Sequence, residues 1–242
     1  MVAYSGGIDS SILATLVTKT ETGVTLLTLG RSGSPDVMSI LTSRSTFLTK
    51  PIVSVAEKVD VENAVSEVEA LVSVSSLSHF EDCVAFFLIS KAVRNLTNAR
   101  YVLSANGPDE LFCGYDRFRR IVDLEGYDAA QNEIFVALKI AEDLASQVKK
   151  VASHFGLLVF EPFLTEEFRT NALAVPIEYK ILVGNDLLRK RIWRYYGRTL
   201  GLPSATVLKP KKAMQYGMGI HNVTESMLKR GILKLEMTSK KI

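Results

Sequence analysis

Short apolar runs rich in β-branched residues alternate with stretches of helical periodicity over the first half of the chain. Apolar runs of this length are typical of buried strands, and apolar residues spaced by three and four are typical of helices. The alternation predicts strands at 2–4, 24–29, 52–55 and 101–104, and helices at 10–18, 35–47, 61–72 and 81–96. Strands separated by helices usually pair in parallel. The sequence therefore predicts an α/β fold with a parallel sheet and flanking helices.

The pattern changes after residue 115. Long helical stretches are predicted at 132–155 and 179–200, with no strong strand pattern between them and with breaks at Pro162, Pro176 and Pro203. No linker rich in Gly, Ser or Pro separates the two halves. We expect one domain over 1–242, with an α/β part at 1–125 that packs against a mainly helical lobe at 126–242.

The composition of the chain excludes several classes of protein. The chain has 242 residues, of which 47% are apolar and 23% charged, which is ordinary for a globular domain and excludes global disorder. No apolar run reaches the roughly 18 residues that a transmembrane helix needs. The first residues do not read as a secretory signal, and two cysteines are too few for a disulfide framework. We expect a cytoplasmic protein with no membrane partner.

The net charge of +3 is too small to argue for a nucleic-acid partner. Basic residues nevertheless gather in one region, where Asp186 is the single acid between residues 180 and 212. Two interpretations stay open, a solvated helix face and a pocket for polyphosphate. The cluster contains Lys180, Arg189, Lys190, Arg191, Arg194, Arg198, Lys209, Lys211 and Lys212.

Residues 5–11, Ser-Gly-Gly-Ile-Asp-Ser-Ser, follow the first predicted strand and precede a helix. Two glycines let the backbone approach a ligand closely, and a helix N-terminus offers unpaired N–H groups to phosphate oxygens. Asp9 would repel a bare phosphate, so its position indicates a bridging divalent cation, Mg²⁺. The alternative is a tight turn capped by Asp9 or Ser10. The loop lacks the Gly-Lys-Ser/Thr of a Walker A motif and the third glycine of a dinucleotide fingerprint.

Residues 103–115, Leu-Ser-Ala-Asn-Gly-Pro-Asp-Glu-Leu-Phe-Cys-Gly-Tyr, form the second motif. They read as a strand that ends in a Gly-Pro turn and projects Asp109 and Glu110 at the carboxyl edge of the sheet, where open α/β folds bind ligands. The alternative is that both acids only favour the first turn of a helix.

The first motif resembles the pyrophosphate loop, or PP-loop, of the N-type ATP pyrophosphatases. The second resembles the Leu-Ser-Gly-Glu-Gly-Ser-Asp-Glu segment of the synthetase domain in the asparagine synthetase family. The resemblance covers nearly the whole chain. Further segments similar to that family, in the same order, are Ser34-Pro35-Asp36, Pro162-Phe163-Leu164, Lys190-x-x-Trp193-Arg194 and residues 209–219.

The resemblance implies an adenine-nucleotide α-hydrolase-like fold and an ATP-dependent, AMP-forming amide ligase of amino-acid biosynthesis. Such an enzyme adenylates a carboxylate, aspartate by analogy, releases pyrophosphate and then transfers ammonia. It also implies that Asp9 and Asp109 hold Mg²⁺, and that Lys211, Asn106 and Glu110 are catalytic. The residues it assigns to ATP are Ser5, Gly6, Gly7, Asp9, Ser10, Ser11, Leu29, Gly107 and Lys190.

The chain departs from the family pattern on the acceptor side. Asn106 stands where asparagine synthetases carry Glu and β-lactam synthetases carry Tyr, and an amide cannot act as a base. Leu158 and Phe160 replace a Glu and an Arg, and Thr165 replaces an acid. Two alternatives therefore stay open: an ATP pyrophosphatase with another acceptor, giving a different amide, a lactam or a modified nucleoside, and a nucleotide-binding regulatory protein without turnover.

The 242 residues do not include the family's glutaminase domain, so we expect ammonia from solution or from a separate glutaminase subunit. The expected partners are otherwise small molecules, and a homodimer is left open. His79, His154 and His221 show no ligand spacing and are assigned no role.

Overall fold

The computed structural model describes residues 1–21, 23–42, 50–74 and 76–234. Within them the chain forms a five-stranded sheet in the order β3-β2-β1-β4-β5, in which all neighbouring strands are parallel. The predicted α/β fold with a parallel sheet is confirmed. The strands are β1 (Val2–Ala3), β2 (Leu26–Arg31), β3 (Ile52–Ala56), β4 (Tyr101–Leu103) and β5 (Leu158–Phe160).

The side chains of the strands alternate between two separate hydrophobic clusters, as the pleat of a strand requires. Val2 and Leu26 face one cluster, which contains helix α1 (Ile8–Thr20). Leu27 and Leu29 face the other, which contains helix α4 (Leu77–Leu96). Both faces of the sheet are therefore buried, which explains why the strands read as nearly continuous apolar runs.

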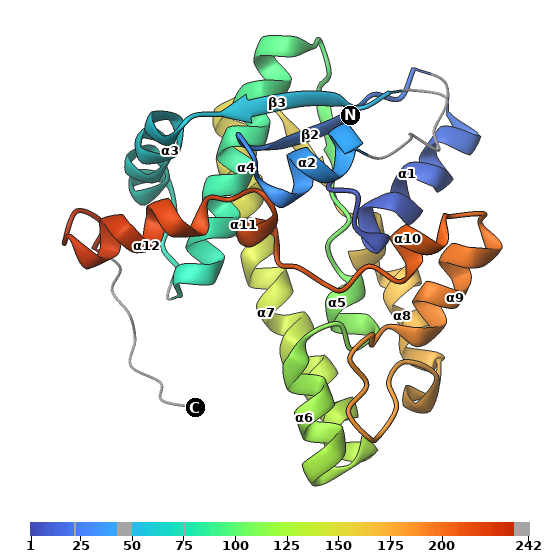
Figure 1. Cartoon of the computed structure of the whole chain (residues 1–242). Helices are drawn as coiled ribbons and strands as arrows, with labels where there is room; N and C mark the ends of the chain where they lie inside the picture. The colour runs from blue at the N-terminus through green and yellow to red at the C-terminus, as the bar shows by residue number, and fades with distance from the viewer. Residues whose placement is uncertain (22, 43–49, 75, 235–242) are drawn as a thin grey trace.

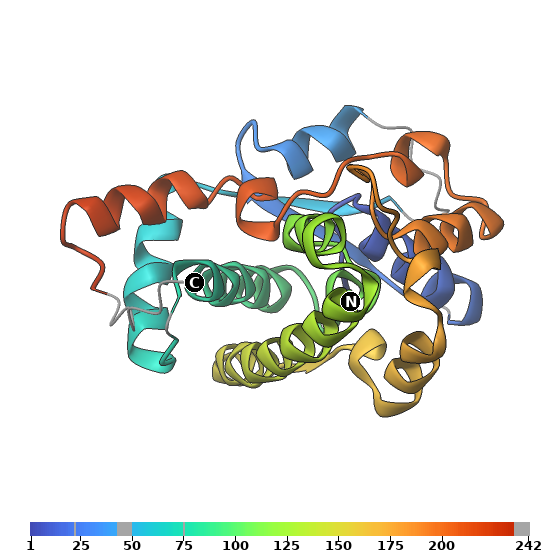
Figure 2. The same ribbon diagram turned by 90° about the horizontal axis from the view of Figure 1, so that it is seen from below.

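Helices cover both faces of the sheet (Figure 1). Helix α2 (Pro35–Thr42) packs on β2 and β3, and α3 (Lys58–Leu71) packs on α4. The long α7 (Tyr127–His154) lies beside α4, as Figure 2 shows from below. The helix predicted at 35–47 ends at Thr42, and residues 43–47 of that prediction lie outside the described residues.

After α7 and β5, the described part of the chain forms short helices joined by loops. Helices α9 (Arg191–Thr199) and α10 (Ser204–Val207) pack against α1, and α6 (Asp116–Glu125) packs against α7. Among the described residues, none of the helices is both long and apolar enough to cross a membrane. The remaining elements are α5 (Pro108–Leu111), η1 (Pro162–Leu164), α8 (Glu166–Ala174), η2 (Ile177–Tyr179), α11 (Met214–Gly217) and α12 (His221–Lys229).

The prediction of a helix over 179–200 is wrong for its first half, because α9 begins only at Arg191. The preceding segment is a loop in which Asn185, Arg189 and Lys190 adopt positive φ. The carboxylate of Asp186 accepts hydrogen bonds from backbone N–H groups of this loop, including that of Arg189 at 3.0 Å. An acid that satisfies backbone donors in this way competes with a helix.

The sequence pattern also missed β5, which lies where no strong strand was expected. It has three residues at the edge of the sheet, and only Val159 is buried, while Leu158 and Phe160 are exposed. A three-residue edge strand gives too short an alternation for periodicity to detect.

The order of the strands places a crevice between β1 and β4. From β1 the chain proceeds to β2 on one side, and from β4 it proceeds to β5 on the other. Open parallel sheets bind ligands at such a switch point, beyond the carboxyl ends of the strands. The two sequence motifs follow β1 and β4, so the fold brings both to this crevice.

Candidate active site

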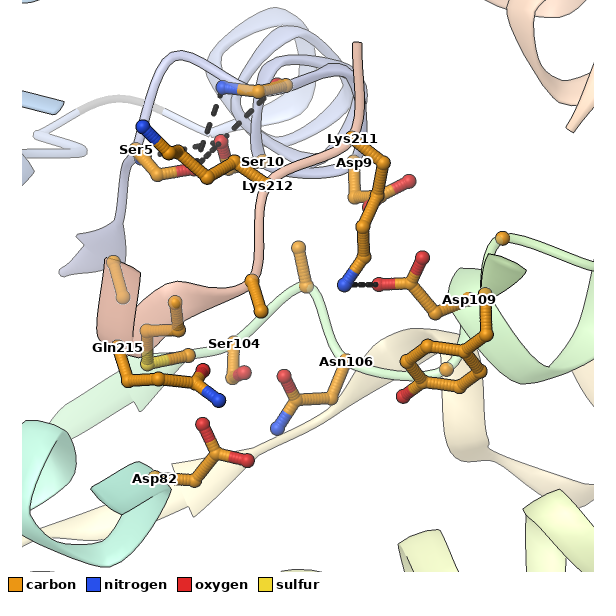
Figure 3. Close-up of a pocket in the computed structure, with 18 of the residues that line it drawn as sticks. Ser5, Asp9, Ser10, Asp82, Ser104, Asn106, Asp109, Lys211, Lys212 and Gln215 are labelled. Atoms are coloured by element: carbon orange, nitrogen blue, oxygen red, sulfur yellow. Dashed lines mark hydrogen bonds and ion pairs between the residues drawn. The ribbon is translucent and has the colours of Figure 1, made fainter. Parts of the chain in front are cut away.

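A cavity of about 640 Å³ opens at the carboxyl ends of β1 and β4 (Figure 3). Its walls come from the loops after β1 and β4, from α4 and α7, and from residues 209–215. Gly6, Ser11 and Lys190 were assigned to ATP from the sequence but do not line the cavity. The sequence-predicted residues that line it are Ser5, Gly7, Asp9, Ser10, Leu29, Asn106, Gly107, Asp109, Glu110 and Lys211.

The loop after β1 is tied by its own serines. The Ser10 hydroxyl accepts a hydrogen bond from the Ser5 backbone N–H at 3.2 Å and lies 3.1 Å from the Ser5 hydroxyl. Gly6 has φ +69°, a conformation that side chains disfavour, and Gly7 caps α1. The N-terminus of a 13-residue helix thus meets the cavity, which is a ready site for phosphate. Ser11 is buried behind the loop.

A buried ammonium joins the two candidate metal-binding acids. Lys190 Nζ lies 2.6 Å from Asp9 Oδ2 and 2.7 Å from Asp109 Oδ1. Burial alone would lower the pKa of Lys190, but the two carboxylates raise it above its ordinary value. Trp193 Nε1 donates to Asp9 Oδ1 at 2.9 Å. A Cβ on Gly114 would lie 2.0 Å from Asp109 Oδ1 and 2.2 Å from Lys190 Cε, so the site requires glycine there.

Lys211 pairs with the same acid from the cavity side. Its Nζ lies 2.9 Å from Asp109 Oδ2 and 4.9 Å from the centre of the Tyr115 ring. Burial would raise the pKa of Asp109, but Lys190 and Lys211 hold it well below its ordinary value. Glu110 Oε1 accepts a 2.6 Å hydrogen bond from the Tyr115 hydroxyl, and burial, followed by the charge of Asp109, raises the pKa of Glu110.

Asp82 is a cavity residue that sequence reasoning missed. It lies on α4, and Figure 3 shows its carboxylate on the same side of the cavity as Gln215. No hydrogen bond or ion pair joins its carboxylate to another described residue. Burial raises the pKa of Asp82 to about 7, and the charge of Lys211 opposes that rise. The one available signal was an acid within the apolar pattern of the predicted helix 81–96.

The cavity can supply only part of a metal's coordination. Within the described ranges, no group of three or more His, Cys, Asp or Glu side chains could hold an ion. Mg²⁺ is usually bound by one or two carboxylates together with substrate phosphates and water. Asp9 and Asp109 are two carboxylates of that kind. In this structure Lys190, Lys211 and the Trp193 N–H contact their oxygens.

The basic residues between 180 and 212 fall into three groups: buried, at the surface, and lining the cavity. Neither a solvated helix face nor a polyphosphate pocket therefore describes all of them. Lys180, Lys190 and Arg194 are buried, whereas Arg191 and Arg198 lie at the surface. Arg194 Nη1 donates to the Lys209 carbonyl at 3.1 Å and so fixes the loop that carries Lys211. The members that line the cavity are Arg189, Lys209, Lys211 and Lys212.

Comparison with known proteins gives one family and several distant relatives. The family model described as asparagine synthase matches residues 2–147. A protein of Methanocaldococcus jannaschii described as a glutamine-hydrolyzing asparagine synthetase is 28% identical, over 90% of this chain and 45% of its own length. The glutamine-hydrolyzing asparagine synthetases of Gallus gallus and Homo sapiens are 23% and 24% identical, over 88% and 93% of this chain. The chain spans less than half the length of these relatives, 39% and 40% of the latter two.

The buried charges lead to a prediction about stability. Replacing Lys190 with Met leaves two acids without their shared cation, and removing one partner of a buried ion pair costs about 3–5 kcal/mol. We expect Lys190→Met to lower the free energy of unfolding in urea by that amount. The control is Lys58→Met, which breaks an exposed pair with Glu62 and should cost less than about 1 kcal/mol. Equal losses in the two variants would contradict the structural role of Lys190.

Asp82 predicts a pH dependence of stability. Its pKa is raised from 3.8 to about 7, so between those values the folded chain holds a proton that the unfolded chain releases. The bound proton stabilises the folded chain, and this contribution to the free energy of unfolding is lost as pH rises through about 7. Asp82→Asn should therefore raise the melting temperature relative to the parent chain at about pH 8, with the difference shrinking or reversing at about pH 5. Exposed Asp143→Asn serves as the control, and a pH-independent effect of Asp82→Asn would contradict the assignment.

Proposed function

This chain belongs to the asparagine synthase family, a family of ATP-dependent ligases, and on that premise we propose that it is an AMP-forming amide ligase. It adenylates a carboxylate, for which we propose aspartate, and then joins the acyl group to ammonia. The observation that carries the proposal is the convergence of the phosphate loop, Asp9, Asp109 and Lys211 on one cavity.

In the proposed first step, a carboxylate oxygen of the substrate attacks the α-phosphorus of ATP. The bond between that phosphorus and the bridging oxygen breaks, and pyrophosphate leaves. The hydroxyls of Ser5 and Ser10 and the N-terminus of α1 bind the departing phosphates. Lys211 stabilises the charge that develops on them. Asp9 and Asp109 would hold Mg²⁺, which neutralises phosphate charge when bound.

In the proposed second step, the nitrogen of ammonia attacks the acyl carbon, AMP leaves with the bonding electron pair, and the nitrogen loses a proton to a phosphate oxygen of AMP or to water. Asn106 lines the cavity and positions the nucleophile by hydrogen bonds, since an amide cannot take the proton. The Asp82 carboxyl, which forms no ion pair or hydrogen bond with a described residue, favours a substrate that carries an ammonium group, as aspartate does.

The experiment that tests the function supplies Mg·ATP, ammonium chloride and one amino acid at a time from a panel. Mass spectrometry of the products identifies the amide, and pyrophosphate exchange into ATP reports adenylation alone. Exchange that depends on the carboxylate supports the ligase. ATP binding without exchange under any acid would support the alternative of a nucleotide-binding protein without turnover.

The position of Lys211 leads to a prediction about the rate of adenylation. Lys211→Ala should slow adenylation by about a hundredfold or more, the scale for losing one preorganised group that stabilises transition-state charge. ATP affinity should fall much less, because the negative charge that Lys211 contacts on the leaving phosphates develops only during the reaction. The control is Lys229→Ala on α12, where the lysine is exposed and pairs with Glu225. The role of Lys211 is wrong if exchange survives in Lys211→Ala at the rate of the control.

The proposed metal ligands predict a dependence of ATP binding on Mg²⁺. Asp9→Asn keeps a carbonyl oxygen that can accept the Trp193 hydrogen bond but loses the charge. Calorimetry should show tighter ATP binding with Mg²⁺ than with a chelator in the parent chain, and little difference between the two in Asp9→Asn. Equal ATP affinity of the parent chain with and without Mg²⁺ would exclude the metal role.

A further inference from the structure

Two adjacent strand ends bring Asn106 to a buried acid. Strands β4 and β5 pair in parallel with Leu103 opposite Phe160, and the Ser104 backbone N–H donates to the Phe160 carbonyl at 3.0 Å. The pairing in register places the residues that follow each strand side by side. Asn106 Nδ2 donates to Glu161 Oε1 at 2.8 Å.

The two residues have different surroundings. Asn106 lines the cavity, and Figure 3 shows its side chain between Ser104 and Asp109. Glu161 is only 6% exposed and does not line the cavity, and its hydrogen bond to Asn106 connects it to a residue that does. It also occupies a different position from the Glu and Arg that the family places on this strand, which are Leu158 and Phe160 here.

The hydrogen bond decides which way the amide of Asn106 faces. A carboxylate only accepts hydrogen bonds, so it binds the NH₂ end of the amide and leaves Oδ1 for the cavity. This orientation matters for an amine nucleophile. An oxygen acceptor takes an N–H of ammonia and leaves its lone pair free to attack, whereas an NH₂ group turned toward ammonia would bind that lone pair.

We propose that Glu161 is a positioning residue, which orients Asn106 so that Oδ1 accepts a hydrogen bond from a neutral amine nucleophile. The proposal rests on the proposed function and assigns the residue that prepares its second step. Ammonia or a primary amine is the chemical class that the oriented oxygen recognises. Adenylation does not involve this oxygen and should not depend on Glu161.

Glu161→Gln provides the test, because glutamine can donate as well as accept and so lets Asn106 face either way. We expect pyrophosphate exchange within about twofold of the parent chain, but a KM for ammonia raised about tenfold or more, the scale of one hydrogen bond to a charged group. The AMP released per amide formed should rise, as water takes the unprotected adenylate. Glu161→Asp, which keeps a carboxylate, should recover part of the loss. Glu166→Gln, an exposed change of the same kind, is the control.

Equal loss of exchange and of amide formation in Glu161→Gln would overturn the proposal in favour of a structural role, and so would no change in either. A second measurement does not depend on turnover. The side-chain NH₂ resonances of Asn106, assigned with Asn106→Asp, should shift in Glu161→Gln and not in Glu166→Gln. Unshifted resonances overturn the inference, whereas absent exchange in the parent chain together with a shift overturns the proposed function and leaves the orientation supported.

Discussion

The buried ammonium of Lys190 is the interaction on which the site depends. Asp9 and Asp109 follow different strands, and both lie within 2.7 Å of the same nitrogen. Two carboxylates this close would repel strongly in a medium of low dielectric constant, so they would not stay ionised side by side without a cation. Lys190 comes from the second half of the chain. The site is therefore assembled only when the loop before α9 packs onto the sheet. The geometry of the cavity thus depends on the folding of the second half of the chain.

The sequence resembles the family's motifs on the proposed nucleotide side of the cavity and departs from them on the proposed acceptor side. The phosphate loop, both acids and Lys211 belong to motifs that resemble those of asparagine synthetases, and these residues line one cavity. On the acceptor side, Leu158 and Phe160 project at the edge strand rather than into the cavity. The polar groups there are instead Asn106, with Glu161 behind it, and Asp82. Asn106 and Glu161 follow β4 and β5, the same strands to which the resemblance assigns the family's acceptor residues, whereas Asp82 lies on α4.

The sequence predicts what local periodicity and short motifs encode. Alternating strands and helices gave the sheet, and the loops after β1 and β4 were recognisable because both chemistry and turn residues are contiguous. Lys190 could not be placed, since its two partners lie 81 and 181 residues away in sequence. The loop before Lys190 was predicted as a helix because the sequence does not reveal that non-glycine residues there adopt positive φ. Asp82 was missed because one acid on an apolar helix does not reveal whether it faces a cavity or solvent.

The distribution of charge in the cavity separates the two proposed half-reactions. Figure 3 shows Lys211, Lys212 and Asp9 beside the loop where pyrophosphate would leave, whereas Asp82 and the Asn106 amide lie on the other side of the cavity, where the nitrogen would enter. A carboxylate at position 106 would attract ammonium, which has no lone pair for attack. An amide held by a carboxylate one hydrogen bond farther away presents a neutral acceptor instead. The substitution of Asn for Glu at position 106 therefore does not remove the acid from the acceptor side. In the proposed second step, Glu161 carries the charge one hydrogen bond behind the nucleophile, where it orients Asn106 without contacting the amine.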